Sequence, residues 1–191
     1  MLTVLVIDES RSRAGEICAG LALAGYQVAA ILAGSENLTA EVEKLQPDVI
    51  LIDTDSPSRD TLEHLAAMNK NMPRPVVIFT QADGQATIRD AVKAGVSAYI
   101  VDGLDPKRIK PIVEVARARF EDTQALRREL DEISQKLSDR KLVDKAKGVL
   151  MKARGIDEDA AYHAMRKLAM ERGQTMAKVA RDVIDMARVL L

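Results

Sequence analysis

The sequence predicts an α/β protein: a doubly wound domain of five strands, then a long coiled-coil helix and a small module of three helices. Over about the first 110 residues, short apolar runs alternate with helical stretches, and several runs are apolar on both faces, as in a parallel sheet. From Asp105 to about Arg154 no strong helix break occurs. We therefore expect a first domain over residues 1–117, a coiled-coil linker over 118–143 and a helical module over 144–191.

Turn-forming residues bound the expected elements of the first domain. Its helical stretches end at Gly25 and Gly95, which suit a helix C-cap, or stop before Pro47 and Pro73. The expected strands are the apolar runs over residues 2–7, 26–32, 48–53, 75–80 and 98–102. Because the chemistry of a doubly wound sheet collects at the carboxyl ends of its strands, the functional site is expected there.

The long helix carries a seam typical of a coiled coil. The seam positions are separated by alternating steps of three and four residues, and charged side chains flank them. They are Thr123, Leu126, Leu130, Ile133 and Leu137. This pattern predicts a homodimer formed through residues 119–140, although a helix that packs on its own domain would give a similar pattern over so short a stretch. Gly148 is the weakest point of the helix.

Two shorter helices are expected after the long one. Asp157 or Glu158 begins the first of them, Gly173 ends it, and Thr175 is a suitable N-cap for the last. Stripes of Met, Ala, Val, Leu and Ile mark one apolar face on each helix, which we expect to be buried. Together with residues 144–154, these helices would form a compact three-helix unit.

The two halves of the chain differ in the sign of their charge. Residues 1–115 carry 11 Lys and Arg against 16 Asp and Glu, a net charge of −5, whereas residues 116–191 carry 17 against 13, a net charge of +4. The basic half indicates a polyanionic partner, although a chance excess on solvated helix faces would look the same. Because neither a membrane-spanning stretch nor a signal-peptide pattern occurs, we expect a cytoplasmic protein with no membrane partner.

Three strand ends carry side chains suited to phosphoryl chemistry. Asp8 and Glu9 follow the first strand, Asp53 ends the third and Thr80 ends the fourth. Carboxylate oxygens are suitable ligands for Mg²⁺, and the ion would neutralise charge on a phosphoryl group that passes to a carboxylate nucleophile. Asp8, Glu9 and Asp53 are therefore candidate Mg²⁺ ligands, although we expect that the protein requires no cofactor.

This constellation resembles the receiver domain of two-component response regulators, a flavodoxin-like fold, and the resemblance extends over residues 1 to about 117. It implies that Asp53, in the segment LIDTDSP, is the phospho-acceptor and that the acidic pair after the first strand belongs to the metal site. It also implies that Thr80 is the switch hydroxyl and Tyr99 the switch aromatic.

One residue departs from the receiver pattern. Typical receivers end the fifth strand with a lysine followed by proline, whereas this chain has Asp102-Gly103. A further carboxylate near Asp8, Glu9 and Asp53 adds like-charge repulsion, and the cation that pairs with a phospho-aspartate is missing. We therefore expect a pseudo-receiver in which phosphorylation is weak or absent. The alternative is that Asp102 caps the following turn and faces solvent.

The segment Asp53-Thr54-Asp55 also resembles the DxD motif of haloacid-dehalogenase-like phosphatases. Those enzymes carry the motif on their first strand and need a catalytic lysine and later acidic residues. Here the motif follows the third expected strand, so a protein without enzymatic activity is the favoured interpretation.

The most specific pattern of the chain lies at residues 142–171. Its elements, in order, are Lys147-Gly148, Leu150-Met151, Glu158, Ala161-Tyr162, Arg166 and Ala169-Met170. They resemble the ANTAR domain, an RNA-binding module named after amidase and nitrate-assimilation antitermination regulators, and the match runs through residue 187. Regulators of nitrate and nitrite assimilation of the NasT type are the most similar in pattern. The resemblance implies antitermination at mRNA leader hairpins, controlled by a ligand-binding sensor protein for nitrate or nitrite.

The positive charge of this segment is sufficient to hold a hairpin backbone. The candidate RNA-binding residues are Lys145, Lys147, Gly148, Lys152, Arg154, Arg166 and Lys167. Tyr162 is the one aromatic residue of the module, and it suits a place in the core as well as an RNA contact, so recognition is expected to rest on Lys and Arg. The alternative is a phosphorylation-controlled response regulator that binds DNA, although acidic residues at the helix starts do not suit a recognition helix.

Overall fold

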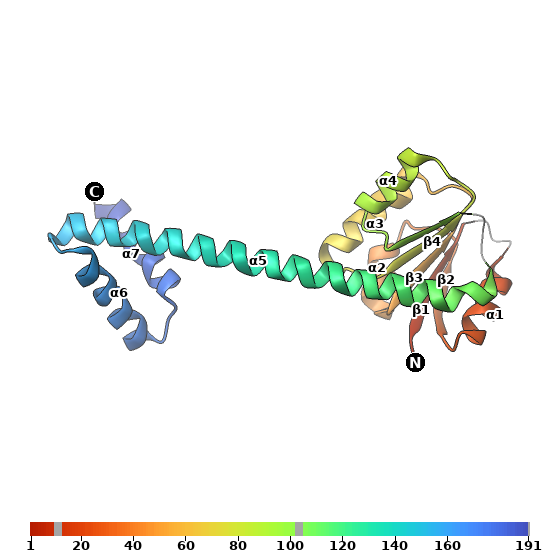
Figure 1. Ribbon diagram of the computed structural model, residues 1–191, viewed down its shortest axis with the longest axis horizontal. Coiled ribbons are helices and arrows are strands. Elements are labelled where there is room, and N and C mark those ends of the chain that lie inside the picture. Colours follow the sequence, from red (N-terminus) through yellow and green to blue (C-terminus); the bar gives the residue numbers. More distant parts are fainter. Residues whose placement is uncertain (10–12, 102–104, 191) are drawn as a thin grey trace. The chain divides into compact units, whose positions relative to one another are not determined.

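The computed structural model describes residues 1–9, 13–101 and 105–190. The chain forms two compact units, Met1–Gln124 and Ala125–Leu191. Figure 1 shows a sheet flanked by helices in the first unit and only helices in the second. Across the described ranges, no helix combines the length and the apolar character that crossing a membrane requires.

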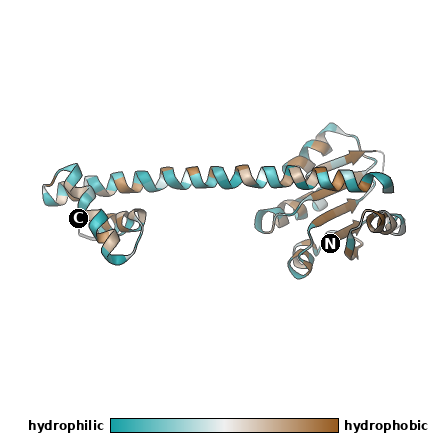
Figure 2. Ribbon diagram, turned by 60° about the horizontal axis from the view of Figure 1, so that its bottom comes forward, coloured by the Kyte–Doolittle hydropathy of each residue, from teal (hydrophilic) through white to brown (hydrophobic). Residues whose placement is uncertain are grey.

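The first unit is built on a five-stranded parallel sheet with the strand order β2-β1-β3-β4-β5. The strands are β1 (Thr3–Asp8), β2 (Gln27–Leu32), β3 (Val49–Asp53), β4 (Val76–Thr80) and β5 (Ala98–Val101). Every residue of β3 and β4 is buried, and Figure 2 shows the strands of the sheet as predominantly hydrophobic. Strands that are covered on both faces have to be apolar on both sides, which explains the continuous apolar runs.

Helices cover both faces of the sheet. They are α1 (Ala14–Leu23), α2 (Leu38–Leu45), α3 (Arg59–Asn71), α4 (Gln85–Lys93), a 3₁₀ turn η1 (Pro106–Arg108) and the start of α5 (Ile109–Arg154). Buried side chains of α2, α3 and α4 pack on one face, and those of α1 and α5 pack on the other. The predicted doubly wound α/β fold with five strands, followed by a long helix and a helical module, is confirmed.

The start of α5 is held closely against α1 and β2. A Cβ atom placed on Gly20 of α1 would lie 2.5 Å from Ile109 Cδ1 and 3.0 Å from Pro106 Cβ. Tyr26, at the start of β2, donates its hydroxyl hydrogen to Glu114 Oε1 at 2.8 Å, and burial together with this contact raises the pKa of Tyr26 to about 12. The absence of a side chain at Gly20 is therefore a packing requirement.

The second unit packs three helical segments around a small core. They are the C-terminal part of α5, α6 (Glu158–Arg172) and α7 (Met176–Leu190). The buried side chains of this core are Ala146, Met165, Ala169, Val179, Ala180 and Ile184. Asp157 caps α6 by accepting the Ala160 N–H at 2.7 Å, and Gly173 ends it with φ of 61°. The predicted caps of these helices are thus confirmed.

Helix α5 continues through Gly148 without interruption. Four positions of its predicted coiled-coil seam are large apolar side chains that stay exposed. They are Leu126, Leu130, Ile133 and Leu137, with exposed fractions of 62%, 66%, 55% and 54%. No other described residue of the second unit covers these four side chains, and the homodimer through this seam stays a prediction.

Gly20→Ala is expected to lower the free energy of unfolding by about 1–3 kcal/mol, because the new methyl group overpacks the contact with Ile109 and Pro106. Chemical denaturation followed by circular dichroism measures the change. Gly15→Ala is the matched control, since it lies on the same helix and its Cβ would meet nothing within 4 Å. If both variants had equal stability, tight packing at Gly20 would be refuted.

Candidate functional site

The carboxyl ends of β1, β3 and β4 bring three polar side chains to one edge of the sheet. Asp8 lies directly opposite Asp53 in the parallel register of β1 and β3, and Thr80 ends the neighbouring strand β4. The exposed fractions of the three residues are 2%, 0% and 0%. The sheet thus gathers the predicted residues Asp8, Asp53 and Thr80 in a buried position, which we call the strand-end site.

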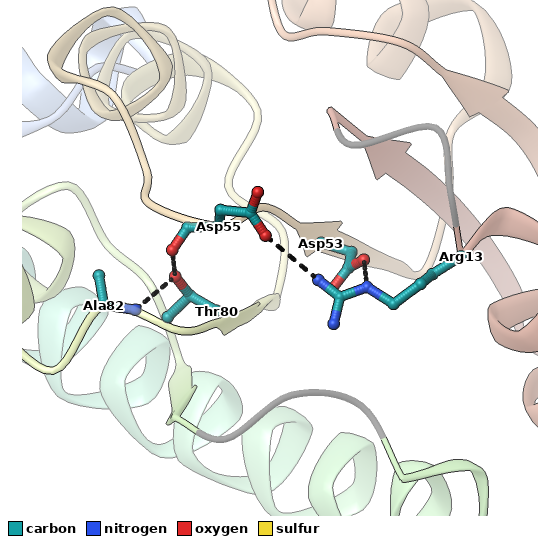
Figure 3. Close-up of polar contacts among 5 residues, drawn as sticks. All are labelled: Arg13, Asp53, Asp55, Thr80 and Ala82. Atoms are coloured by element: carbon teal, nitrogen blue, oxygen red, sulfur yellow. Dashed lines mark hydrogen bonds and ion pairs between the residues drawn. The ribbon is translucent and has the colours of Figure 1, made fainter.

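Arg13 supplies a cation at this site. Its Nε lies 2.9 Å from Asp53 Oδ2, and its Nη2 lies 3.7 Å from Asp55 Oδ1, as Figure 3 shows. The Arg13 side chain is 24% exposed, whereas Asp53 is fully buried. When this ion pair breaks, the buried Asp53 charge is left without a partner. Breaking it therefore costs more free energy than breaking an ion pair at the surface.

Sequence reasoning did not identify Arg13. The available signal was a basic residue in the loop that follows the first strand, at the edge where the strand ends meet. The sequence has Arg11 and Arg13 in this loop, and charge alone does not say which of them faces Asp53. Arg11 lies outside the described residues.

The pKa of the Asp53 carboxyl lies above its ordinary value. Burial is the main cause, because it disfavours the charged form, and the carboxylates of Asp8 and Asp55 act in the same direction. Arg13 acts in the opposite direction, through its charge and its contact with Asp53, without cancelling the effect of burial. The ionised form of Asp53 is therefore costly for the folded state.

Thr80 and Tyr99, the predicted switch pair, converge on Ala82. The Thr80 hydroxyl donates to the backbone carbonyl of Asp55 at 2.9 Å and accepts the Ala82 N–H at 3.2 Å (Figure 3). The Tyr99 hydroxyl donates to the carbonyl of Ala82 at 3.0 Å, and burial raises the pKa of this phenol. Thr80 therefore ties the loop after β4 to the loop after β3, and its hydrogen is given to Asp55 and not to Asp53.

The third predicted carboxylate, Glu9, points to a different partner. Its Oε1 accepts the Thr61 hydroxyl at 2.8 Å, while its backbone N–H donates to the Asp53 carbonyl at 3.1 Å. Within the described ranges, no three His, Cys, Asp or Glu side chains are grouped so that they could hold a metal ion. Glu9 therefore does not form a group of three carboxylates with Asp8 and Asp53 in this arrangement, and Mg²⁺ binding by these residues stays a prediction.

The predicted departure from the receiver pattern, Asp102-Gly103, lies outside the described residues. The structure therefore does not place Asp102 relative to Asp53. Typical receivers have a lysine at the end of the fifth strand, where this sequence has none. Arg13, in the loop after β1, supplies a cation to Asp53 instead, and β1 lies on the opposite side of β3 from β5.

In the second unit, Lys147 lies in an internal contact. Its Nζ is 2.7 Å from Asp144 Oδ1 and 2.7 Å from Glu158 Oε1, and its side chain is 15% exposed. The hydrogen bonds to Asp144 and Glu158 raise the pKa of Lys147. Because Asp144 and Lys147 belong to α5 and Glu158 to α6, this contact joins the two helices.

The other predicted RNA-binding residues are more open. Lys145, Lys152, Arg154 and Arg166 are exposed and form no ion pair within the described part of the chain. Lys167 is exposed as well, with its Nζ 3.9 Å from Glu171 Oε1. A Cβ atom on Gly148 would meet nothing within 4 Å, so no neighbour in the described chain requires a glycine there.

Comparison with protein families identifies both parts of the chain. The family model of the response regulator receiver domain matches residues 4–114, more than half of the chain. The chain belongs to this family. The ANTAR domain model matches residues 131–184 of the same chain. The protein is therefore a response regulator that combines a receiver domain with an ANTAR domain.

Individual relatives share one or both of these regions. The transcriptional regulatory protein PdtaR of Mycobacterium tuberculosis is 29% identical over 161 residues, which cover 84% of this chain and 78% of PdtaR. The nitrate regulatory protein of Klebsiella oxytoca is 36% identical over 75 residues, which cover 39% of this chain and 19% of that protein. The crystal structure of a CheY-like receiver domain protein from Methanospirillum hungatei has a TM-score of 0.56 and 20% identity, covering 64% of this chain and 98% of that one. This last likeness confirms the receiver fold.

Asp53→Asn is expected to raise the free energy of unfolding at neutral pH by about 0.5–2 kcal/mol, as the removal of a costly buried charge does. The pKa of Asp53 is raised above its ordinary value of 3.8, so the folded state holds this proton more tightly than the unfolded chain does. Wild type therefore loses stability relative to the variant as pH rises from 3.8 through the folded pKa, and the difference is constant above it.

Thermal or denaturant unfolding at several pH values measures this difference. Asp55→Asn is the matched control, because the Asp55 side chain is 82% exposed and its contact with Arg13 is longer. A destabilised Asp53→Asn variant at neutral pH would show that the ion pair with Arg13 outweighs the cost of burial.

Proposed function

We propose that this response regulator binds RNA and acts in the cytoplasm as a transcription antitermination regulator at mRNA leader hairpins. The observation that carries the proposal is an exposed row of lysines on α5, within the region that matches the ANTAR domain. We call it the lysine ridge: Lys141, Lys145, Gly148 and Lys152. A regulator of this kind needs no enzymatic activity of its own.

The lysine ridge has the geometry of a backbone-binding surface. Its members are spaced by four, three and four residues, so they lie along one face of the helix. That face is turned away from Ala146, which is fully buried in the core of the second unit. Gly148 leaves the middle of the ridge without a side chain, so that a phosphate backbone can approach the helix closely between Lys145 and Lys152.

The charge pattern favours RNA over duplex DNA. A recognition helix enters the major groove with its N-terminal residues, and α6 begins with Asp157, Glu158 and Asp159. Three carboxylates at this end would face the phosphates on both sides of the groove. The alternative, a phosphorylation-controlled regulator that binds DNA, therefore has less support from this unit than RNA binding.

We also propose that Asp53 phosphorylation is dispensable. Asp53 is fully buried and already paired with Arg13, and its neighbour Asp8 is 2% exposed. A regulatory input would then come from a ligand-binding sensor protein. The partial likeness to the nitrate regulatory protein of Klebsiella oxytoca supports nitrate or nitrite as its ligand.

The exposed seam of α5 supports a homodimer through residues 119–140, within the linker that we place at residues 118–143. Leu126, Leu130, Ile133 and Leu137 follow the step of four, three and four that a coiled coil needs. Two copies would place two ANTAR domains on one RNA, and the second contact would form at a raised effective concentration.

The test of RNA binding is a titration of the full chain with a pool of RNA hairpins that share a stem and have a randomised loop, against DNA hairpins of the same sequences. We expect tighter binding to RNA. The double variant Lys145→Ala/Lys152→Ala should weaken it and should reduce the slope of log affinity against log salt by about 2, one for each phosphate contact.

Lys44→Ala/Lys70→Ala is the matched control, because it removes the same charge from exposed lysines of the first unit. Lys147→Ala is not suitable for this test, since the loss of its contacts with Asp144 and Glu158 would disturb the fold. Equal or tighter binding to the DNA hairpins would overturn the proposed function.

Gly148→Ala is expected to stabilise the second unit by about 0.5–1 kcal/mol, because alanine favours a helix interior and the new Cβ meets no neighbour. The same variant should bind the RNA hairpin pool several-fold more weakly, since the methyl group would stand between the lysines. Unfolding and RNA titration measure the two effects. A stabilised variant with unchanged RNA affinity would place the RNA away from Gly148.

A further inference from the structure

The outer face of α6 combines aromatic, apolar and cationic side chains. It consists of Tyr162, His163, Arg166 and Met170, and we call it the α6 outer face. The residues that α6 buries, Ala161, Met165 and Ala169, form the neighbouring stripe of the helix, and Tyr162 borders this stripe, three residues before Met165. Tyr162 follows Ala161 directly, and it is 40% exposed. The structure thus places Tyr162 at the edge of the surface and not inside the core.

Arg166 is central to this face. It lies four residues after Tyr162, three after His163 and four before Met170, so its neighbours on the helix surface are the other three residues. The rings of Tyr162 and His163 meet edge to face, with centroids 6.0 Å apart and an angle of 70° between their planes. Met170 is 74% exposed beside them. A single exposed apolar residue is ordinary, whereas an exposed tyrosine, histidine and methionine around one arginine form a continuous surface.

The surface is also hollowed. His163, Arg166, Lys167, Met170 and Glu171 line a depression of about 340 Å³. Glu171 brings a negative charge to it, and this charge faces Lys167 at 3.9 Å. Arg166 forms no ion pair within the described part of the chain, so its guanidinium remains available to an incoming group.

We propose that the α6 outer face binds unstacked bases of an RNA hairpin loop, an inference that rests on the proposed RNA-binding function. Aromatic rings and the arginine plane stack on bases of any identity, and the polarisable Met170 thioether adds contact area. The free charge of Arg166 pairs with a loop phosphate. Base stacking therefore contributes more to recognition than the scarcity of aromatic residues in this half predicts.

The test compares two RNA probes. The first is a tight-binding hairpin taken from the pool with a randomised loop, and the second has the same stem closed by a loop of abasic nucleotides. Wild type should bind the abasic probe more weakly. Tyr162→Ala should lose about 5- to 100-fold in affinity for the first probe, the range for loss of one stacked base, and little for the abasic probe.

Tyr162→Phe should recover most of the affinity, because it restores the ring without the hydroxyl. Met186→Ala is the control for truncating an exposed side chain elsewhere in this unit, since Met186 lies on α7 and is 59% exposed. Thermal unfolding followed by circular dichroism verifies that each variant is folded. If Tyr162→Ala is unfolded, crosslinking of wild type to 4-thiouridine in the loop replaces it, and a crosslink within residues 162–170 is expected.

Two results would overturn the proposal in distinguishable ways. Equal losses of Tyr162→Ala on both probes, or crosslinks only outside α6, would place the loop bases elsewhere while leaving RNA binding intact. A wild type that does not prefer RNA hairpins to DNA hairpins would remove the proposed function, and the role of the α6 outer face with it.

Discussion

The parallel register of β1 and β3 is the constraint on which the receiver site depends. It sets Asp8 opposite Asp53 at a sheet edge where both residues are almost entirely buried. Two carboxylates in such a place raise the cost of ionisation, so a cation close by stabilises the ionised site. Arg13 provides that cation from the loop after β1, and a second ion pair joins it to Asp55. The resting charge balance of the site thus involves this chain's own arginine.

The lysines of the ANTAR region differ in whether a carboxylate of the same unit is paired with them. Lys147 is held between Asp144 and Glu158, where it joins α5 to α6. Lys145 and Lys152 lie exposed on either side of Gly148 and have no carboxylate partner within the described chain. Residues that are close neighbours in the sequence therefore differ in their contacts: Lys147 joins α5 to α6, while Lys145 and Lys152 stay exposed, as the proposed contact with a polyanion requires.

The fold could be predicted from the sequence because the strands are apolar on both faces and Gly or Pro bounds the helices. The strand-end residues Asp8, Asp53 and Thr80 followed from the same pattern, since parallel strands end at one edge. Side-chain partners could not be predicted: nothing in the spacing says that Glu9 turns to Thr61 or that Arg13 reaches Asp53. Charge likewise did not separate Lys147 from Lys145, because pairing depends on how α6 packs against α5.

We propose that Asp53, which is buried and paired with Arg13, does not act as a phosphorylation switch. The direct measurement is intact-mass analysis of the full chain after incubation with acetyl phosphate and Mg²⁺, followed by titration with the hairpin pool, with Asp53→Asn as the control. We expect no phosphoryl adduct on wild type, unchanged RNA affinity, and an adduct on Arg13→Gln, whose Asp53 has lost its partner. A phosphoryl adduct on Asp53 of wild type that changes the affinity for RNA would contradict it.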